Sequence, residues 1–245
     1  MDVQKEIAFF DSFEADHGEY DVLAEESYQR ILNVLRRELS PRPDMAVVDL
    51  GCGTGAFTRR LGGLGPAVTG VDISPRSIER ARSQGGGRFL VGDICDSRLP
   101  TASFDCAVMS GVLHHVPTRE ERVRSLEEAF RILRPGGLFF SYDPNRHSPS
   151  MWLYRDPHSP LCSQAGKTEN EVLLTRRELA GELEEAGFSC VSVRGLSGIA
   201  SRYVEGKVAR RLLPVYNRVY EPLIRFSGFE HVLGTFLVAT AVRTS

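Results

Sequence analysis

The residues with the clearest chemical content form a glycine-rich turn that follows a short apolar run at 45–48. Gly51, Gly53 and Gly55 stand at alternate positions. Without a Cβ they let the backbone turn sharply and approach a ligand closely. Helix-forming sequence resumes at Ala56, and the free N–H groups at a helix start favour electron-rich ligand atoms. The spacing therefore predicts a nucleotide-binding turn between a buried strand and a helix.

Two classes of ligand suit this turn. Gly51-x-Gly53-x-x-Ala56, with Asp72 about 20 residues farther on, satisfies the dinucleotide fingerprint. The alternative is S-adenosylmethionine (SAM), and Asp49, two residues before the first glycine, favours it. A carboxylate about 4 Å from a unit charge contributes about 4 kcal/mol at an effective dielectric constant of about 20, which opposes a pyrophosphate and favours the ammonium group of SAM. We therefore expect SAM as cofactor, with S-adenosylhomocysteine (SAH) as product, and disfavour an NAD oxidoreductase.

Five segments, taken in order, resemble the motifs of class I SAM-dependent methyltransferases. They are Val47–Gly55, Val68–Ser74, Val91–Ile94, Phe104–Val116 and Leu133–Leu138. The chain looks most like small-molecule methyltransferases that modify quinones, sugars and natural products. The resemblance implies an α/β fold, a Rossmann-like doubly wound seven-stranded sheet, mostly parallel with an antiparallel last strand, plus helical cap elements. From the apolar runs we expect strands at 45–48, 67–71, 88–91, 104–109, 138–142, 188–193 and 235–242.

The resemblance also implies a set of cofactor contacts. An acid at the position of Asp72 accepts hydrogen bonds from both ribose hydroxyls, and two carboxylate oxygens suit a vicinal diol. Asp93 matches the family's acceptor for the adenine amino group, with Ile94 against the ring face. The expected cofactor-binding residues are Asp49, Gly51, Cys52, Gly53, Gly55, Asp72, Ile73, Asp93, Ile94, Ser110 and His115.

Two adjacent histidines, His114 and His115, follow the fourth expected strand. Neighbours on a helix or strand point to different sides, so we expect at most one of them to face the site. Two metal ligands on one helix face would stand three or four residues apart, so no metal site is predicted. Sugar O-methyltransferases with this motif have a histidine near the acceptor, which implies a catalytic role for His115. Asp143 matches a second acidic residue of those relatives, which orients a histidine or binds an acceptor hydroxyl; structural roles for both residues stay open.

Composition places the chain among ordinary single-domain proteins. It has 245 residues, 42% hydrophobic content and a net charge of −2, so no overall positive field attracts nucleic acid. Its five scattered cysteines form no paired pattern, which argues against a disulfide framework and favours the reducing cytoplasm. The sequence shows neither a long apolar run nor a signal peptide. We expect a cytoplasmic protein whose partner is a small-molecule acceptor and not a nucleic acid.

The single domain, 1–245, divides into functional parts. We expect a helical N-terminal lid at 1–40, in which Tyr20 is a candidate contact of the methionine end of SAM, and a SAM-binding core at 41–145. Irregular sequence at 146–175 and a second insertion at 195–232 are expected to cover the acceptor, with Trp152 as a candidate pocket wall. An amphipathic helix is expected at 118–133, and its charged residues, Arg122 and Glu128 among them, are expected to face solvent.

The second insertion contains a segment, 202–226, in which apolar residues recur at roughly helical spacing. Pro214 and Pro222 are expected to kink or split it. Its net charge is +4 in a chain of −2. Three interpretations stay open: a solvated helix capping the active site, a site for an anionic acceptor, or a peripheral contact with a membrane surface.

These observations favour a SAM-dependent methyltransferase that acts on a small molecule, with oxygen slightly favoured over nitrogen or carbon as the methylated atom. One alternative is methylation of a lipidic or quinone-like acceptor at the membrane surface. Another is a SAM-binding protein without transferase activity, because a complete cofactor site does not by itself require catalysis.

Overall fold

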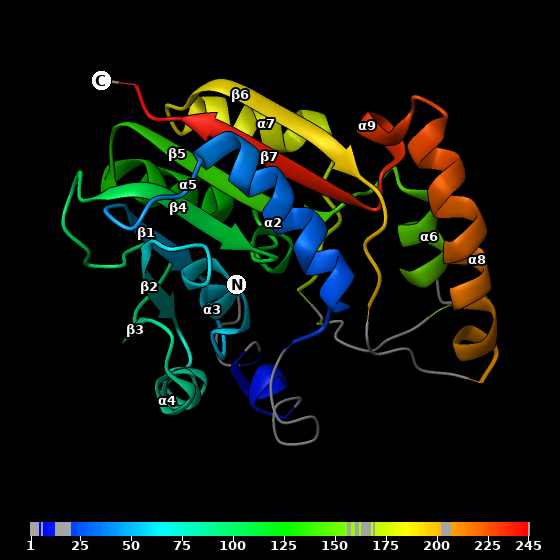
Figure 1. Cartoon of the computed structure of the whole chain (residues 1–245), viewed down its shortest axis with the longest axis horizontal. Coiled ribbons are helices and arrows are strands. Elements are labelled where there is room, and N and C mark those ends of the chain that lie inside the picture. The colour runs from blue at the N-terminus through cyan, green and yellow to red at the C-terminus, as the bar shows by residue number, and fades with distance from the viewer. Residues whose placement is uncertain are drawn as a thin grey trace.

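The computed structural model describes residues 5, 7–12, 21–155, 158–159, 162, 168, 170–201 and 207–244, without side chains at 209, 210, 213 and 217. A seven-stranded sheet in the order β3-β2-β1-β4-β5-β7-β6 forms its centre (Figure 1). The strands are β1 (Ala46–Leu50), β2 (Ala67–Asp72), β3 (Arg88–Val91), β4 (Phe104–Ser110), β5 (Leu133–Pro144), β6 (Ser189–Leu196) and β7 (Phe236–Val242). The strands lie where the apolar runs predicted them, with β5 extended at both ends.

The strand directions confirm the predicted fold class. Strands β1 to β5 pair in parallel, and β7 runs antiparallel to both of its neighbours, β5 and β6. The strand order reverses between β1 and β4, because β2 and β3 lie on one side of β1 and all later strands lie on the other. Ligands of open α/β sheets bind at such a switch point, outside the carboxyl ends of the strands. The glycine turn follows β1, and Ser110 is the last residue of β4.

Helices cover both faces of the sheet. They are α2 (Glu25–Leu39), α3 (Ala56–Gly62), α4 (Pro75–Gln84), the 3₁₀ turn η1 (Leu113–His115), α5 (Arg119–Ile132), α6 (Pro149–Arg155), α7 (Arg176–Glu185), α8 (Lys207–Phe226) and α9 (Glu230–Leu233). Consecutive strand residues point to opposite faces. Phe140 thus packs in the cluster that includes Ile31 and Leu35 of α2, while Phe139 packs in the cluster that includes residues of α5 and α7.

The position of α2 changes the expected extent of the N-terminal lid. Ile31 and Leu35 have no exposed surface, and the helix crosses one face of the sheet (Figure 1). Residues 25–39 are therefore part of the core, because their apolar stripe is covered by the sheet. Of the expected lid over 1–40, only residues before α2 remain as candidates.

Three other expectations differ from the structure. The region 146–175 is not wholly irregular, since α6 begins at Pro149. Segment 207–226 forms one helix despite Pro214 and Pro222; both prolines are exposed, so water can bind the carbonyl groups whose N–H partners they remove. Arg122 and Glu128 of α5 are buried, because each forms an ion pair with a partner of opposite charge.

Among the described helices, none is both long enough and apolar enough to cross a bilayer.

Candidate cofactor and acceptor site

The glycine turn after β1 has the backbone that its sequence predicted. Gly51, Gly53 and Gly55 have φ angles of +77°, +51° and +81°, a region that side-chain-bearing residues rarely adopt. A Cβ on Gly51 would lie 2.6 Å from Val112, and one on Gly55 would lie 2.8 Å from Phe89. At Gly53 a Cβ would meet no atom within 4 Å. The outer glycines thus permit close packing, and the middle one leaves bare backbone beside open space.

Asp72, at the end of β2, fixes this turn. Its Oδ2 accepts a hydrogen bond from the Gly53 N–H at 2.8 Å, and its Oδ1 accepts one from the Ser74 N–H at 2.9 Å. Burial raises the pKa of the Asp72 carboxyl, and these backbone donors offset part of the rise. A carboxylate has about four lone-pair positions, so Asp72 retains acceptor capacity for a diol.

Asp49, at the end of β1, has no exposed surface. Its Oδ2 accepts from Thr58 Oγ1 at 2.7 Å and its Oδ1 from Ser110 Oγ at 3.2 Å. Burial raises the pKa of the Asp49 carboxyl to about 6, against the opposing effect of these two hydroxyl donors. Its influence on a ligand would therefore act through its charge and through the orientation of Ser110, rather than through an exposed oxygen.

The other expected cofactor residues lie along the same edge of the sheet. Cys52 is buried with Ile78, Ala81 and Phe89, and burial raises the pKa of its thiol. The register pairs Asp72 with Val91, so Ile73 stands beside the segment that carries Asp93 and Ile94. Asp93 is exposed, and its Oδ1 accepts from the Cys95 N–H at 2.8 Å. Ile94 is partly buried against the main core.

The two histidines lie on η1, directly after the exit of β4. The backbone N–H of His114 donates to Asp143 Oδ1 at 3.1 Å, and its ring Nδ1 lies 3.0 Å from the same oxygen. Asp143 has no exposed surface, and burial raises the pKa of its carboxyl to about 7 although the His114 N–H opposes the rise. A Cβ on Gly111 would lie 3.6 Å from His114 Cε1, so this ring lies beside the strand exit.

The ring nitrogen of His115 contacts a different residue. Its Nδ1 lies 3.1 Å from Thr168 Oγ1, and its ring centroid lies 5.3 Å from that of Phe10. The two imidazole centroids are 4.0 Å apart. The two rings thus lie against one another although they are adjacent in sequence, and each Nδ1 is held by its own partner.

A short N-terminal helical turn reaches both sides of this region. Phe10 contacts His115, and Asp11 Oδ1 accepts a hydrogen bond from Ser74 Oγ at 3.2 Å. Residues 7–12 thus connect the histidines with the residues that follow Asp72. Tyr20 lies outside the described residues, and Trp152 on α6 is 61% exposed.

Comparisons with known proteins identify the domain. Residues 48–141 match the family described as "Methyltransferase domain". The chain is 31% identical over 163 residues to "O-methyltransferase cnsE" of Penicillium expansum, covering 63% of this chain and 56% of that protein. It is 28% identical to "Probable tRNA methyltransferase 9B" of Bos taurus over 159 residues, covering 63% of this chain and 34% of that protein. The chain thus spans only part of the length of these two relatives.

A solved structure agrees in fold. The Haloferax volcanii methyltransferase in complex with the Trm112 methyltransferase activator superposes with a TM-score of 0.68 at 21% identity, covering 96% of this chain and 98% of that one. The chain carries a class I SAM-dependent methyltransferase domain. SAM is the cofactor of this family.

The residues of this methyltransferase domain fit SAM. Bare backbone faces open space at Gly53, and Asp72 offers acceptor positions beside it. Thr54, in the same turn, is buried and its Oγ1 has no hydrogen-bond partner among the described residues. Buried polar atoms are nearly always paired, so this hydroxyl suits a polar group of a bound ligand.

Sequence reasoning missed several residues of this site. Thr58 and Thr168 supply hydroxyls to Asp49 and His115, yet isolated threonines carry no motif. The resemblance implies a catalytic role for His115, although Asp143 pairs with His114. The number of residues between the end of β4 and the 3₁₀ turn decides which histidine meets Asp143. The sequence alone does not show where that turn begins.

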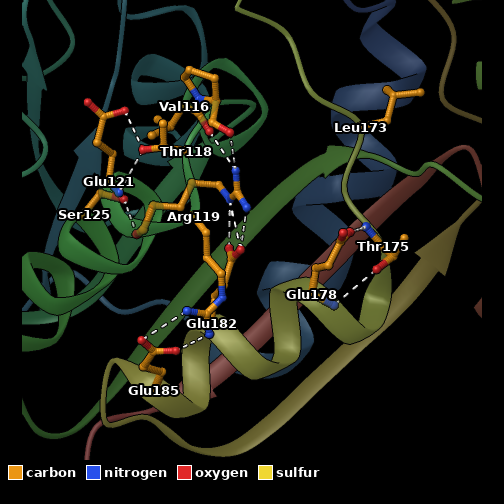
Figure 2. A network of polar contacts seen from close by, with 12 residues as sticks. Val116, Thr118, Arg119, Glu121, Ser125, Leu173, Thr175, Glu178, Glu182 and Glu185 are labelled. Carbon is orange, nitrogen blue, oxygen red and sulfur yellow. Dashed lines mark hydrogen bonds and ion pairs between the residues drawn. The ribbon is translucent and has the colours of Figure 1, made fainter. Parts of the chain in front are cut away.

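A buried ion pair between α5 and α7 contacts the backbone directly after the two histidines. Arg122 Nη2 lies 2.6 Å from Glu182 Oε1, which joins α5 to α7. Arg122 Nη1 also donates to the carbonyl oxygen of Val116 at 3.0 Å, one residue after His115 (Figure 2). The Thr175–Glu178 capping box fixes the start of α7, the helix that carries Glu182 (Figure 2). This network therefore fixes where η1 ends.

Proposed function

We propose that the chain transfers a methyl group from SAM to an oxygen atom of a small-molecule acceptor. The observation that carries this proposal is the contact between His114 and Asp143 beside the exit of β4. With the proton on Nδ1 donated to Asp143, Nε2 is the acceptor nitrogen of a neutral imidazole. A hydroxyl acceptor needs such a base, whereas an amine that is already neutral does not.

Most of the rate would come from orientation. SAM, when bound, supplies an electrophilic methyl group because its sulfur carries a positive charge. The glycine turn and Asp72 would hold the nucleoside, and the N-terminal turn with Phe10 and Asp11 would cover it. Positioning two reactants in this way contributes about 7–11 kcal/mol, so the fold alone accounts for much of the expected catalysis.

The proton would be handled by the histidine turn. His114 Nε2 takes the proton of the acceptor hydroxyl while the hydroxyl oxygen forms its bond to the methyl carbon. Bound SAM would supply the methyl group and would keep the carbon–sulfur electron pair as SAH. Asp143 offsets the positive charge on His114, as a buried carboxylate does for the base of a catalytic triad. His115, held by Thr168 and Phe10, lies against His114 and would shape the acceptor pocket.

A second candidate is methylation of a lipidic acceptor at a membrane surface. It is supported by the exposed apolar face of α8, which is described below. A nucleic-acid acceptor is disfavoured by the net charge of −2, and its absence stays a prediction because one relative is named as a tRNA methyltransferase.

The first experiment identifies the acceptor class. Methyl-labelled SAM is incubated with the protein and with pooled polar metabolites, a lipid extract in vesicles, or total tRNA. We expect label in the metabolite pool. Label in lipid supports the second candidate, label in tRNA overturns both, and SAH binding without label anywhere indicates a SAM-binding protein without transferase activity.

The second experiment tests the base. With an acceptor in hand, His114→Ala is expected to lower kcat by roughly 10²–10⁴ while the SAH dissociation constant changes little. Asp143→Asn should lower kcat as well, because the imidazole loses the partner that fixes its tautomer. His115→Ala is the matched comparison, and a larger loss in this variant than in His114→Ala would assign the base to His115.

A further inference from the structure

The outward face of α8 is apolar. Six of its side chains are between 45% and 82% exposed, and we call them the apolar stripe: Val208, Leu212, Val215, Val219, Leu223 and Phe226. At 3.6 residues per turn these positions fall within an arc of about 80° along almost the whole helix. A surface helix normally buries such a stripe, and monomeric soluble proteins rarely leave a large contiguous apolar patch in water.

The rotation of α8 is fixed by a polar anchor on its inner side. Glu221 is buried and accepts hydrogen bonds from Ser150 Oγ at 3.1 Å, from Thr235 Oγ1 at 2.5 Å and from the Gly198 N–H at 2.5 Å. These donors come from α6, from the residue before β7 and from the segment after β6. The helix is thus held with its polar anchor inward and its apolar stripe outward.

Basic residues border the apolar stripe on one side. Lys207, Arg211, Arg218 and Arg225 are exposed and fall within an arc of about 40° next to the stripe; we call them the basic row. Tyr216 and Tyr220 stack at 4.8 Å and fall on the other side of the stripe. Among the described side chains of α8, the one acid is the buried Glu221. The outward surface therefore combines apolar contact with positive charge.

We propose that α8 docks the protein onto an anionic lipid bilayer, lying in the plane of the surface. The apolar stripe would enter the boundary between headgroups and acyl chains, and the basic row would contact anionic headgroups. This combination of apolar face, positive flank and modest overall hydrophobicity is what interfacial helices use. Juxtamembrane basic residues add attraction to an anionic leaflet.

The positive charge of the basic row argues against a second copy of the chain as the partner that covers the apolar stripe. In a twofold dimer the same surface meets itself, so two basic rows would approach one another. Helix pairs of this kind place acids opposite bases beside the apolar seam, and the described part of α8 exposes no acid. An anionic bilayer supplies the missing negative charge.

The docked orientation places the candidate site near the bilayer. The carboxyl end of β5 leads through Asn145 into α6, and Ser150 of α6 contacts Glu221 of α8. Figure 1 shows α6, α8 and α9 together at the end of the molecule toward which β4 points. The proposal does not depend on methyl transfer, since a bilayer can be bound without any acceptor.

Co-sedimentation with vesicles tests the proposal. The protein is mixed with vesicles of phosphatidylcholine plus phosphatidylglycerol, or of phosphatidylcholine alone, without added acceptor. We expect binding to the anionic vesicles that falls by about tenfold or more at ~1 M salt, where the Debye length is about 3 Å. Replacing Arg211, Arg218 and Arg225 together by Gln should weaken binding by roughly 100-fold.

Single apolar-to-acidic variants test whether vesicle binding depends on the apolar stripe or on exposed apolar residues in general. Val219→Asp should abolish binding. Val91→Asp is the matched control, because Val91 is exposed to a similar degree, 51% against 57%, but lies on β3 at the far edge of the sheet. Circular dichroism and the thermal midpoint establish that both variants fold.

Three outcomes would overturn the proposal. The first is no binding of the wild-type chain to anionic vesicles at low salt. The second is equal binding by Val219→Asp and wild type. The third is a dimer in sedimentation velocity that Val219→Asp dissociates, in the absence of vesicle binding. None of these bears on whether the domain binds SAH or transfers methyl groups.

Discussion

Two buried carboxylates, Asp49 and Asp143, stand at the carboxyl ends of β1 and β5. Burial raises the pKa of both, to about 6 and about 7, from an ordinary value near 4. Their partners differ: Asp49 accepts from two hydroxyls, whereas Asp143 accepts from the backbone and ring of one histidine. The first arrangement suits a fixed charge and the second suits proton transfer.

Asp49 should make SAH affinity depend on pH. The ionised carboxylate favours the ligand ammonium group, so affinity should fall as the pH drops through about 6. At a separation of about 8 Å the attraction is about 2 kcal/mol at an effective dielectric constant of about 20, or roughly 30-fold in affinity. Calorimetry at pH 8 should show that loss in Asp49→Asn, and its pH profile should be flat. The exposed Asp44→Asn is the control, and a wild-type profile in Asp49→Asn would exclude the charge effect.

The same residue should lower stability in the absence of ligand. Because its folded pKa lies above its unfolded value, the stability that Asp49 contributes is fully present below about pH 4 and is lost as the pH rises through about 6. Asp49→Asn should therefore raise the free energy of unfolding at pH 8 by about 2 kcal/mol, with no gain near pH 4. Denaturant titration at the two pH values measures this, and a loss of stability at pH 8 would contradict it.

At the scale of elements, α5 and α7 are joined by two ion pairs of different burial (Figure 2). Arg122 and Glu182 are buried, whereas Arg119 and Glu185 are about half exposed. Removing one partner of a buried pair leaves an uncompensated charge, but an exposed pair contributes little. The contrast gives a matched test within one interface.

Glu182→Gln should lower the free energy of unfolding by about 3 kcal/mol, which corresponds to roughly 6–12 °C in Tm for a chain of this size. Glu185→Gln, in the exposed pair of the same two helices, should cost less than about 1 kcal/mol. Arg122→Met with Glu182→Leu should recover most of the loss, because no buried charge remains. Thermal unfolding measures all three, and equal losses in the two single variants would contradict the buried-charge argument.

Sequence patterns predicted the elements of this fold better than their orientation. Apolar runs gave all seven strands, and the glycine spacing gave the turn, because both depend on local backbone geometry. The stripe of α8 was visible as a period, but the side that faces the protein depends on Glu221 and three partners distant in sequence. Likewise, a charged residue such as Arg122 looks solvated until its partner on another helix is known.

At the scale of the whole molecule, the candidate site draws on separate parts of the chain. The glycine turn joins β1 to α3, Asp72 ends β2, and Asp93 follows β3. Phe10 and Asp11 close the region from the N-terminal side through His115 and Ser74. A ligand that contacts all of these parts binds only the folded chain, so its affinity adds to the stability of the entire domain.

SAH should therefore raise the thermal midpoint of the whole chain. At a ligand concentration about 100 times the dissociation constant, binding adds about 2.7 kcal/mol, or roughly 5–11 °C for a domain of this size. NADH at the same concentration should leave the midpoint unchanged, because its pyrophosphate would approach the charge of Asp49. In Asp49→Asn the shift caused by SAH should shrink while the midpoint without ligand rises at pH 8. A shift with NADH and none with SAH would contradict the electrostatic choice of ligand on which the assignment of Asp49 depends.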